Sequence, residues 1–499
     1  MDKNYDVLIR NANVYDGEGR PPINVDVAVE SDRLARIGNL DGCSAKLEID
    51  ASGLALSPGF IDVHTHDDFA ALTHPDMGFK SRGGVTTCIV GNCGFGAAPF
   101  AEAVDMLGRL TPGPALSPYE GHAGYAAALE STTPGVNIGV LAGHGTIRKA
   151  TVGGVDRAPT DREMSAMKSL LQEALDAGVL GISSGLIYDP GRYAATDELV
   201  ELVSVMQGTG ALYVTHMRDE GAGLVESVAE AIDIGARGGV GVQISHHKAS
   251  GRESWGLVKD SLTLIDAAQL RGEDVHADQY PYTAGSTSLQ TVLENGAFAG
   301  ASTSNRMSSL EPANVVIATA PGHPEWEGRS IADLGAALNQ TPRAASEMVV
   351  SQARGTTVIL HMMNEDDVQR VLRHHSTMIG SDGIPTLDGR PHPRLYNSFA
   401  RVLGHYARDL GLFDLSTAIH RMSGFPAHKF GLRDRGVIRE GAYADLVLFD
   451  AATVIDKGTF EDPNQYPAGI RKVFVNGRVA VDEDKVQAQR HGRVLRRAA

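Results

Sequence analysis

The sequence predicts an α/β protein whose main part is a (β/α)8 TIM-like barrel. Between about residues 57 and 382, short apolar runs that end in polar or charged residues alternate with amphipathic stretches, which is the pattern of repeated βα units. The runs number eight, as a closed barrel requires. They lie at 59–66, 84–92, 136–144, 178–184, 211–216, 240–246, 274–280 and 377–382.

The segment after Thr160 illustrates the helices between the runs. Thr160 and Glu163 have the spacing of a capping box, and Gly178 is placed to end a helix just before the fourth run. The apolar stripe between them consists of Met164, Met167, Leu171, Ala174 and Leu175. We therefore expect one amphipathic helix here, followed directly by a strand.

Both ends of the chain predict β structure outside the barrel. Alternating strands are expected at 5–14, 25–29, 34–37, 444–450 and 472–475, with a turn at 476–477. Their pairing would give a small β-sandwich domain from 1–56 and 430–499, which leaves 57–429 for the barrel. The stretch at about 286–353 is rich in Ser, Ala, Asn, Gly and Pro and separates runs seven and eight, so it predicts an insertion or lid near the barrel mouth.

Composition limits the partners of the protein. The chain has 499 residues, 42% of them hydrophobic and 21% charged, and a formal net charge of −16. This charge repels phosphate backbones and anionic lipid, so neither nucleic acid nor a membrane is an expected partner. No signal peptide and no apolar window of about 20 residues is found, which predicts a cytoplasmic protein. The sequence is compatible with an oligomer.

Two histidines end the first run in a pattern that suits a metal ion. His64 and His66 are two positions apart, and in a strand such residues share one face, so two imidazoles can bind one divalent cation. A pair of polar residues at a strand exit is the alternative. In barrels of this kind the active site lies at the carboxyl ends of the strands. The run-end candidates there are His66, His144, His216, His246 and Asp382.

Cys93 adds a sulfur ligand to this end of the barrel. It follows the second run between an asparagine and a glycine, and the three cysteines of the chain are too few for a disulfide framework. Taken singly, a buried cysteine, a structural histidine and a turn-capping Asp382 are the alternatives. Together, imidazole, thiolate and carboxylate are the ligands that zinc prefers, which predicts a zinc site.

Several motifs resemble those of the amidohydrolase superfamily and, within it, of the D-aminoacylase (N-acyl-D-amino-acid deacylase) family. The resemblance covers nearly the whole chain. The motif at 58–68 is shared across the superfamily, whereas Gly-Asn-Cys-Gly at 91–94 together with Ile-Ser-His-His-Lys at 244–248 is narrower. The other matching motifs lie at 143–148, 215–220, 280–287, 380–383 and 390–394.

The resemblance implies particular roles for these residues. Many relatives bridge two metals with a carboxylated lysine on strand four, but the fourth run has no lysine, and the cysteine fits the deacylase branch instead. By this resemblance, Cys93, His216 and His246 would hold one tightly bound Zn2+. A second, weaker site would consist of His64, His66 and Asp382. The resemblance also implies which residues bind the substrate carboxylate and places Tyr188 near the scissile carbonyl. The carboxylate-binding residues would be Lys248, Tyr280, Ser286 and Arg394.

Three of the implied binding residues have a plainer alternative. Lys248 and Arg394 suit an anionic ligand but are equally compatible with solvated surface charges, and Tyr280 with core packing. An acidic substrate side chain would need another cation, for which Arg192 and His392 are the candidates.

The implied reaction is zinc-dependent hydrolysis of the amide bond of N-acyl-D-amino acids, with Asp382 as base and then acid. An L-Xaa-D-Xaa dipeptidase, a hydrolase of cyclic amides and a catalytically silent structural relative remain alternatives.

Overall fold

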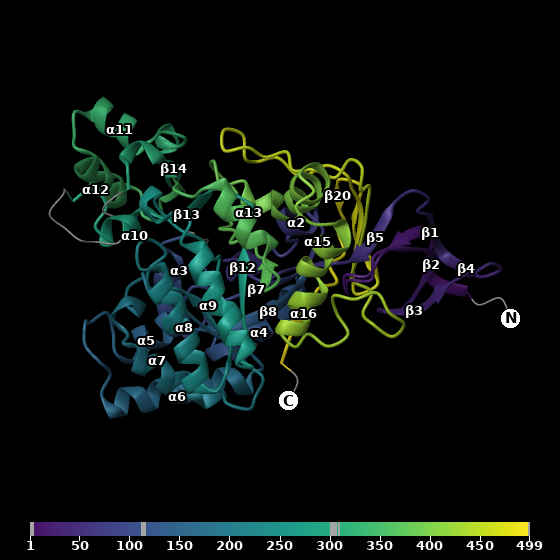
Figure 1. Cartoon of the computed structure of the whole chain (residues 1–499), viewed down its shortest axis with the longest axis horizontal. Helices are drawn as coiled ribbons and strands as arrows, with labels where there is room; N and C mark the ends of the chain where they lie inside the picture. Colours follow the sequence, from purple (N-terminus) through teal and green to yellow (C-terminus); the bar gives the residue numbers. More distant parts are fainter. Residues whose placement is uncertain (1–3, 111–115, 300–306, 308–309, 498–499) are drawn as a thin grey trace.

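The computed structural model describes residues 4–110, 116–299, 307 and 310–497, and its main body is a barrel of eight parallel strands (Figure 1). Each run that the sequence predicts overlaps one strand, so the barrel prediction is confirmed. Neighbouring strands follow chain order. They are β6 (Phe60–Asp62), β7 (Val85–Val90), β8 (Asn137–Gly143), β9 (Gly181–Gly185), β10 (Leu212–His216), β11 (Gly241–Ile244), β12 (Val275–Gln279) and β16 (Thr377–Ile379).

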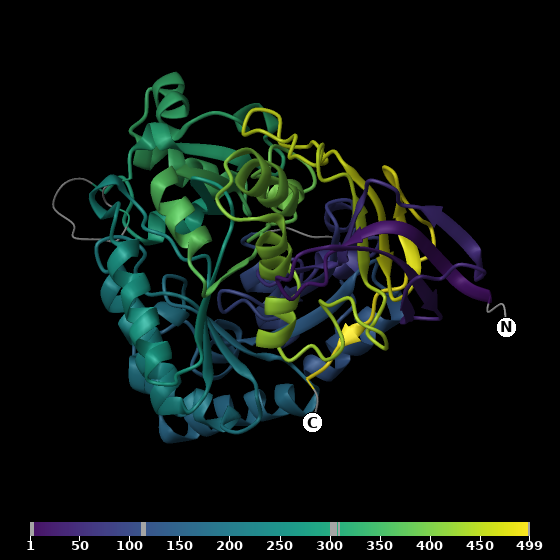
Figure 2. The same ribbon diagram turned by 45° about the vertical axis from the view of Figure 1, so that its right-hand side comes forward.

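The barrel closes between its first and last strands, just beyond their carboxyl ends. The backbone amide of Asp382 donates to the carbonyl of His64 at 2.7 Å, and the amide of His66 donates to the carbonyl of Gly383 at 3.0 Å. Thr65 and Gly383 form a parallel bridge between these bonds. The seam of the barrel therefore brings the loop after β6 next to the loop after β16. Figure 2 shows the strands of the barrel grouped inside its helices.

Helices cover the outside of the barrel because each buries one apolar stripe against the strands. The helix after Thr160 has the predicted capping box, and the five apolar residues of its predicted stripe are all buried. The helices of the barrel and its loops are α1 (Ala70–Thr73), α2 (Gly78–Ser81), α3 (Phe100–Leu107), α4 (Gly121–Thr132), α5 (His144–Thr151), α6 (Asp161–Asp176), α7 (Thr196–Val203), α8 (Leu224–Gly238), α9 (Val258–Leu270), α13 (Glu365–Arg373), α14 (Arg394–Arg401), α15 (Leu415–Met422) and α16 (Gly424–Lys429).

The chain ends form a second sheet with its own core. Strand β5 (Ala55–Pro58) joins the two ends, because it pairs with β1 (Asn4–Val14) on one side and with β17 (Leu446–Phe449) on the other. The sequence did not predict β4 and β5 as strands. The remaining strands of this nine-stranded sheet are β2 (Ile23–Glu30), β3 (Arg33–Gly38), β4 (Ser44–Asp50), β18 (Ile470–Val475), β19 (Arg478–Asp482) and β20 (Lys485–Val486).

The last strand departs from the predicted small domain of residues 430–499. Strand β21 (Val494–Leu495) pairs with Ile138 and Gly139 of β8, in the barrel. Strand β9 pairs with β8 only from Leu141 onward, so β9 leaves the amino half of β8 unpaired on that side. An unpaired strand edge readily accepts another strand, and the carboxyl end of the chain covers this one.

The insertion between β12 and β16 is an ordered layer. Strands β13 (Ala284–Ser288), β14 (Val315–Thr319) and β15 (Thr357–His361) form an antiparallel sheet, with β15 in the middle. Helices α10 (Leu289–Glu294), α11 (Ile331–Leu338) and α12 (Pro342–Gln352) pack on it around a separate apolar core. The sheet extends beyond the predicted 286–353 at both ends, and residues 300–306 and 308–309 lie outside the described residues. Within the described part of the chain, no helix is both long and apolar enough to cross a bilayer.

We expect Asn137 to hold the terminal sheet onto the barrel. Its side chain donates to Asp445 at 3.2 Å and accepts from Asn476 at 2.8 Å, and all three side chains are buried. Changing Asn137 to Ala leaves buried polar groups without partners, which should lower the free energy of unfolding by about 1–3 kcal/mol. Urea unfolding followed by circular dichroism would measure the loss.

The exposed Asn24 of β2 provides the control for this variant. Asn24→Ala should change stability by no more than about 0.5 kcal/mol, as is usual for surface positions. Equal effects of the two substitutions would contradict the role given to Asn137.

Candidate metal centre

Six side chains that the sequence nominated as metal ligands converge at the barrel mouth. His216 is the last residue of β10, and the others lie in loops directly after strands. All six are buried, with at most 7% of any residue exposed. They are His64, His66, Cys93, His216, His246 and Asp382.

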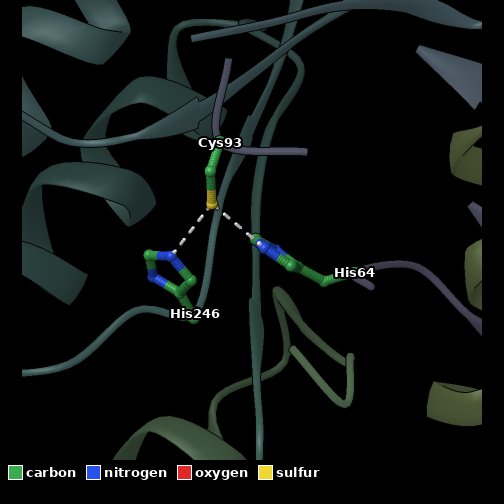
Figure 3. Close-up of side chains that lie close together, drawn as sticks. All are labelled: His64, Cys93 and His246. Carbon is green, nitrogen blue, oxygen red and sulfur yellow. Dashed lines mark hydrogen bonds between the residues drawn. The ribbon is translucent and has the colours of Figure 1, made fainter. Parts of the chain in front are cut away.

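The sulfur of Cys93 lies at the centre of this cluster. Its Sγ is 3.3 Å from His64 Nε2, 3.5 Å from His246 Nε2 and 3.6 Å from His216 Nδ1. Figure 3 draws the contacts with His64 and His246. Cys93 therefore contacts both partners that the resemblance implied and His64 in addition. His64 then continues the cluster toward His66 and Asp382.

Asp382 lies on the other side of His64. Its Oδ1 is 3.2 Å from His66 Nε2 and 3.5 Å from His64 Nε2. Among the described residues at the mouth, three sets of ligand atoms lie within 4.8 Å of one another: His64, Cys93 and His246; His64, His66 and Asp382; and His216, Glu220 and His246. The implied second site is one of these sets, whereas the implied tight site of Cys93, His216 and His246 is divided between the other two.

These distances fit zinc. Tetrahedral zinc binds sulfur at about 2.3 Å and imidazole nitrogen at about 2.0–2.1 Å, which places the two ligand atoms about 3.5 Å apart. The contacts of Cys93, at 3.3 to 3.6 Å, match this spacing. A second cation would fit between His64, His66 and Asp382, where the spacing is similar.

The backbone holds three of the candidate ligands in an uncommon conformation. Cys93, His246 and Asp382 have φ values of 55°, 36° and 49°, in the left-handed region that side chains other than glycine rarely adopt. Gly94, which follows Cys93, has φ of 76°, and a Cβ there would approach the amide nitrogen of Gly185 to 2.8 Å. The glycine beside the cysteine is therefore required for the loop to pack on β9. Such strain is typical of functional sites.

Electrostatics favour the charged forms of Cys93 and His66. Burial alone would raise the pKa of the Cys93 thiol, but His64, with hydrogen bonds from His216 and His246, outweighs burial and holds this pKa well below its usual range. Burial would lower the pKa of His66, yet contacts with Asp382 and Cys93 raise it to about 9. These shifts favour a thiolate at Cys93 and a protonated His66. Because histidine binds a metal as the neutral imidazole, a cation bound by His66 would displace its proton.

Two carboxylates that sequence reasoning missed orient these histidines. Asp278 Oδ1 is 3.3 Å from His64 Nδ1 and accepts the amide of His246 at 2.8 Å. Glu220 Oε1 is 2.9 Å from His246 Nδ1. A carboxylate behind a histidine is the usual support of a metal ligand. The signal for Asp278 was an acidic residue inside the buried seventh run, and that for Glu220 was its place four residues after His216.

The residues implied in carboxylate binding also lie at the mouth, but their charges are already paired. The Lys248 ammonium is 2.5 Å from Glu220 Oε1, and the Arg394 guanidinium is 2.9 Å from Asp382 Oδ2. The ring of Tyr280 lies 4.5 Å from the guanidinium carbon of Arg394. Ser286 contributes its carbonyl, which accepts from Arg394 at 3.3 Å.

A small cavity of about 40 Å³ lies beside the cluster. Its polar lining consists of His66, Tyr188, His216, Glu220, His246, Lys248, Tyr280, Ser286, Thr287 and Asp382. Its apolar lining consists of Leu110, Ile187, Met307, Leu360, Met362 and Ile384, together with Gly285. A larger hollow of about 480 Å³ shares Ile187, Glu220, Met307 and Met362 with it. The candidate ligands thus border a space where a small molecule could bind.

Three other nominated residues do not reach this cavity. His144 Nε2 contacts Glu198 at 3.0 Å, and Arg192 bonds to the carbonyl of Glu294 and to Tyr193. His392 Nε2 contacts the carbonyl of Ala284 at 2.9 Å. Each of these polar groups therefore already has a structural partner, and neither Arg192 nor His392 lines the cavity as the extra cation for an acidic side chain.

The comparisons with known proteins agree with this geometry. A family model described as "Amidohydrolase family" matches residues 47–481. The D-aminoacylase of Alcaligenes xylosoxydans xylosoxydans is 42% identical over 99% of this chain and 98% of its own length. A D-aminoacylase structure from a study of its binuclear metal centre has a TM-score of 0.88 and 40% identity, and covers 99% of this chain and 100% of that one.

A third relative was solved with its metal. N-acyl-D-glutamate deacylase from Bordetella bronchiseptica, complexed with zinc and a phosphonate inhibitor that mimics the tetrahedral intermediate, has a TM-score of 0.89 and 36% identity, with 99% and 100% of the two chains covered. The chain therefore belongs to the amidohydrolase family, in the branch of the D-aminoacylases and N-acyl-D-amino-acid deacylases. The family resemblance of the motifs is confirmed.

We expect Cys93 to be required for tight zinc binding, because its sulfur is the common neighbour of three imidazoles. Cys93→Ala should fold but lose most of its tightly bound zinc, as measured by atomic absorption after dialysis. Cys88→Ala is the matched control, since Cys88 is also fully buried but is outside these ligand sets. Full zinc content in the Cys93 variant would contradict the assignment.

Proposed function

We propose that this protein hydrolyses the amide bond of N-acyl-D-amino acids, giving a carboxylate and a free D-amino acid. The observation that carries the proposal is the convergence of Cys93, His216 and His246 with Asp382 beside one cavity, which Lys248 also lines. The deacylases among its relatives support the substrate class.

Zinc bound by Cys93, His216 and His246 would polarise the amide carbonyl and lower the pKa of water toward about 7. Residues of the chain have to accept and donate the protons that the reaction transfers. Asp382 faces His66 and lines the cavity, where it can take a proton from the attacking water and deliver it to the departing nitrogen. One carboxylate would thus serve first as base and then as acid, and no protein nucleophile is needed.

Tyr188 is suited to stabilise the developing oxyanion. Its ring packs against His216, with 5.0 Å between ring centroids, and its hydroxyl has a single long contact of 3.5 Å with Thr287. Burial, followed by the negative charge of Cys93, raises the pKa of this phenol well above its usual value. Tyr188 therefore remains protonated and can donate a hydrogen bond to the carbonyl oxygen of the substrate.

Lys248 and Arg394 would bind the α-carboxylate of the substrate in place of their present carboxylate partners. Each cation is paired with a carboxylate of the site, Glu220 and Asp382 respectively. Lys248 and Asp382 line the cavity, whereas Arg394 is reached through its contact with Asp382. A substrate carboxylate that enters can therefore compete directly for Lys248, and for Arg394 by replacing Asp382 as its partner, because it offers the same charge and the same two oxygens. With the carboxylate held there and the amide at the metal, only one enantiomer places its side chain in the remaining space.

Asp382→Asn should lower kcat by about 10²- to 10⁴-fold, because the amide side chain cannot accept the proton. Zinc bound to Cys93, His216 and His246 should stay close to stoichiometric. Steady-state kinetics and metal analysis on the same preparation would test this. Asp388→Asn, an exposed position in the same loop, is the control and should keep the wild-type kcat. A loss of less than tenfold in the Asp382 variant would assign the proton transfer to another residue.

The function itself is tested with a substrate panel of controlled stereochemistry. N-acetyl-D-amino acids should be cleaved, while their L enantiomers, the corresponding α-amides, L-Xaa-D-Xaa dipeptides and hydantoins should not. Arg394→Ala should lower kcat/KM on the good substrates about ten- to hundredfold, since a charge-assisted contact is worth about 1.5–3 kcal/mol.

Equal rates on both enantiomers would refute the stereochemical part of the proposal. Unchanged kinetics of the Arg394 variant would refute the carboxylate contact and leave the metal centre standing. Preferred cleavage of dipeptides or hydantoins would show a different amide substrate on the same site.

A further inference from the structure

A buried lysine lies beneath the barrel seam, outside the candidate site. Lys80 in α2 is only 2% exposed. Its ammonium donates to Asp62 Oδ2 at 2.8 Å, to Thr65 Oγ1 at 2.9 Å and to Ser381 Oγ at 2.9 Å. The three donors of the ammonium thus have three oxygen partners, one at the end of β6, one in the loop after β6 and one in the loop after β16.

These partners flank the candidate ligands. Thr65 lies between His64 and His66, and Ser381 precedes Asp382. Asp62 reinforces the connection, because it accepts both the backbone amide of Ser381 at 2.8 Å and its hydroxyl at 2.6 Å. Lys80 and Asp62 together therefore connect the loop after β6 to the loop after β16.

The charges of this group suit a fixed geometry. Asp67 is a second carboxylate near the ammonium, at 3.3 Å, and the side chains of Lys80, Asp62 and Asp67 are all within 1% of complete burial. Removing three charged groups from water is costly, and a buried ion pair does not by itself make a protein more stable than packed apolar side chains would. These buried charges are therefore better explained by the positions in which they hold the neighbouring loops than by a gain in the stability of the protein.

We propose that Lys80 is a positioning residue that sets the separation between the His64 and His66 pair and Asp382, and so shapes the second cation site and the proton acceptor. The inference rests on the function proposed above only where catalysis is concerned. The contacts of Lys80 with Thr65 and Ser381 fix the two sides of the site relative to each other. A shift of about 1 Å in such a site can cost about 10²-fold in rate.

Lys80→Met tests the proposal, because it keeps the length of the side chain and removes the three donors. Lys429→Met is the matched control. Lys429 is also a buried lysine, 2.7 Å from Asp274, but Asp274 precedes β12 and so lies at the opposite end of the barrel from the candidate site. Both variants should lose thermal stability, whereas only the Lys80 variant should change the site.

Three measurements separate positioning from stability. Crystal structures of the two variants should show a longer distance from His66 Nε2 to Asp382 Oδ1 only in Lys80→Met, compared with 3.2 Å here. Titration with zinc should show a 10- to 100-fold weaker second binding event in that variant, the usual effect of losing a residue that supports metal ligands. With an N-acetyl-D-amino acid that the wild type cleaves, kcat should fall about 10²-fold and KM should change little.

An unchanged His66 to Asp382 distance in Lys80→Met, together with wild-type zinc titration, would overturn the proposal. If Lys80→Met does not fold, the double variant Asp62→Asn/Lys80→Met, which removes one charge of each sign, takes its place in all three measurements. Failure of both variants to fold would also overturn the proposal and assign Lys80 a purely structural role. A wild-type protein inactive on the substrate panel would refute the proposed function, while the crystal structures would still decide the role of Lys80.

Discussion

The contact between the Cys93 sulfur and three imidazoles is the constraint on which the barrel mouth depends. The sulfur is buried, and its negative charge is stabilised only because His64, His216 and His246 surround it. The three histidines come from β10 and from the loops after β6 and β11, so the contact is possible only when the barrel is closed and these strand ends are in register. The cluster therefore exists only in the closed barrel.

The negative groups of the mouth each have a counterion. Glu220 is paired with Lys248, and Asp382 with Arg394. Burial would raise the pKa of Asp382, but the charge of Arg394, followed by that of His246, holds it well below its usual range. A carboxylate held so strongly in its ionised form is a weak base. If Arg394 paired with a substrate carboxylate instead, the pKa of Asp382 would rise. Asp382 would then be a stronger base when the substrate is bound.

The sequence was sufficient to predict the barrel because the pattern of each strand is local. All eight runs overlap a strand, and His64, His66, Cys93, His216, His246 and Asp382 meet because strand ends of a barrel share one rim. The grouping of these residues around Cys93 could not be predicted from the sequence. The position of Cys93 next to His64 as well as His216 and His246 depends on the left-handed backbone at Cys93, His246 and Asp382, which no periodicity reveals.

The supporting residues were missed for a different reason. The sequence places Asp278 in a buried run and Glu220 four residues after His216, but the contacts of these residues and of Lys80 join separate segments of the chain. Lys80 and Ser381, for example, are 301 positions apart. A lysine in a short polar segment is typical of an exposed loop, and only the fold shows that Lys80 is buried beneath the seam. The ligands of such a centre are thus specified locally by residue type at strand ends, whereas their spacing is specified by buried polar contacts between distant segments. This difference explains why the chemistry of the site could be predicted before its geometry, and why the residues that fix the geometry are found only in the folded protein.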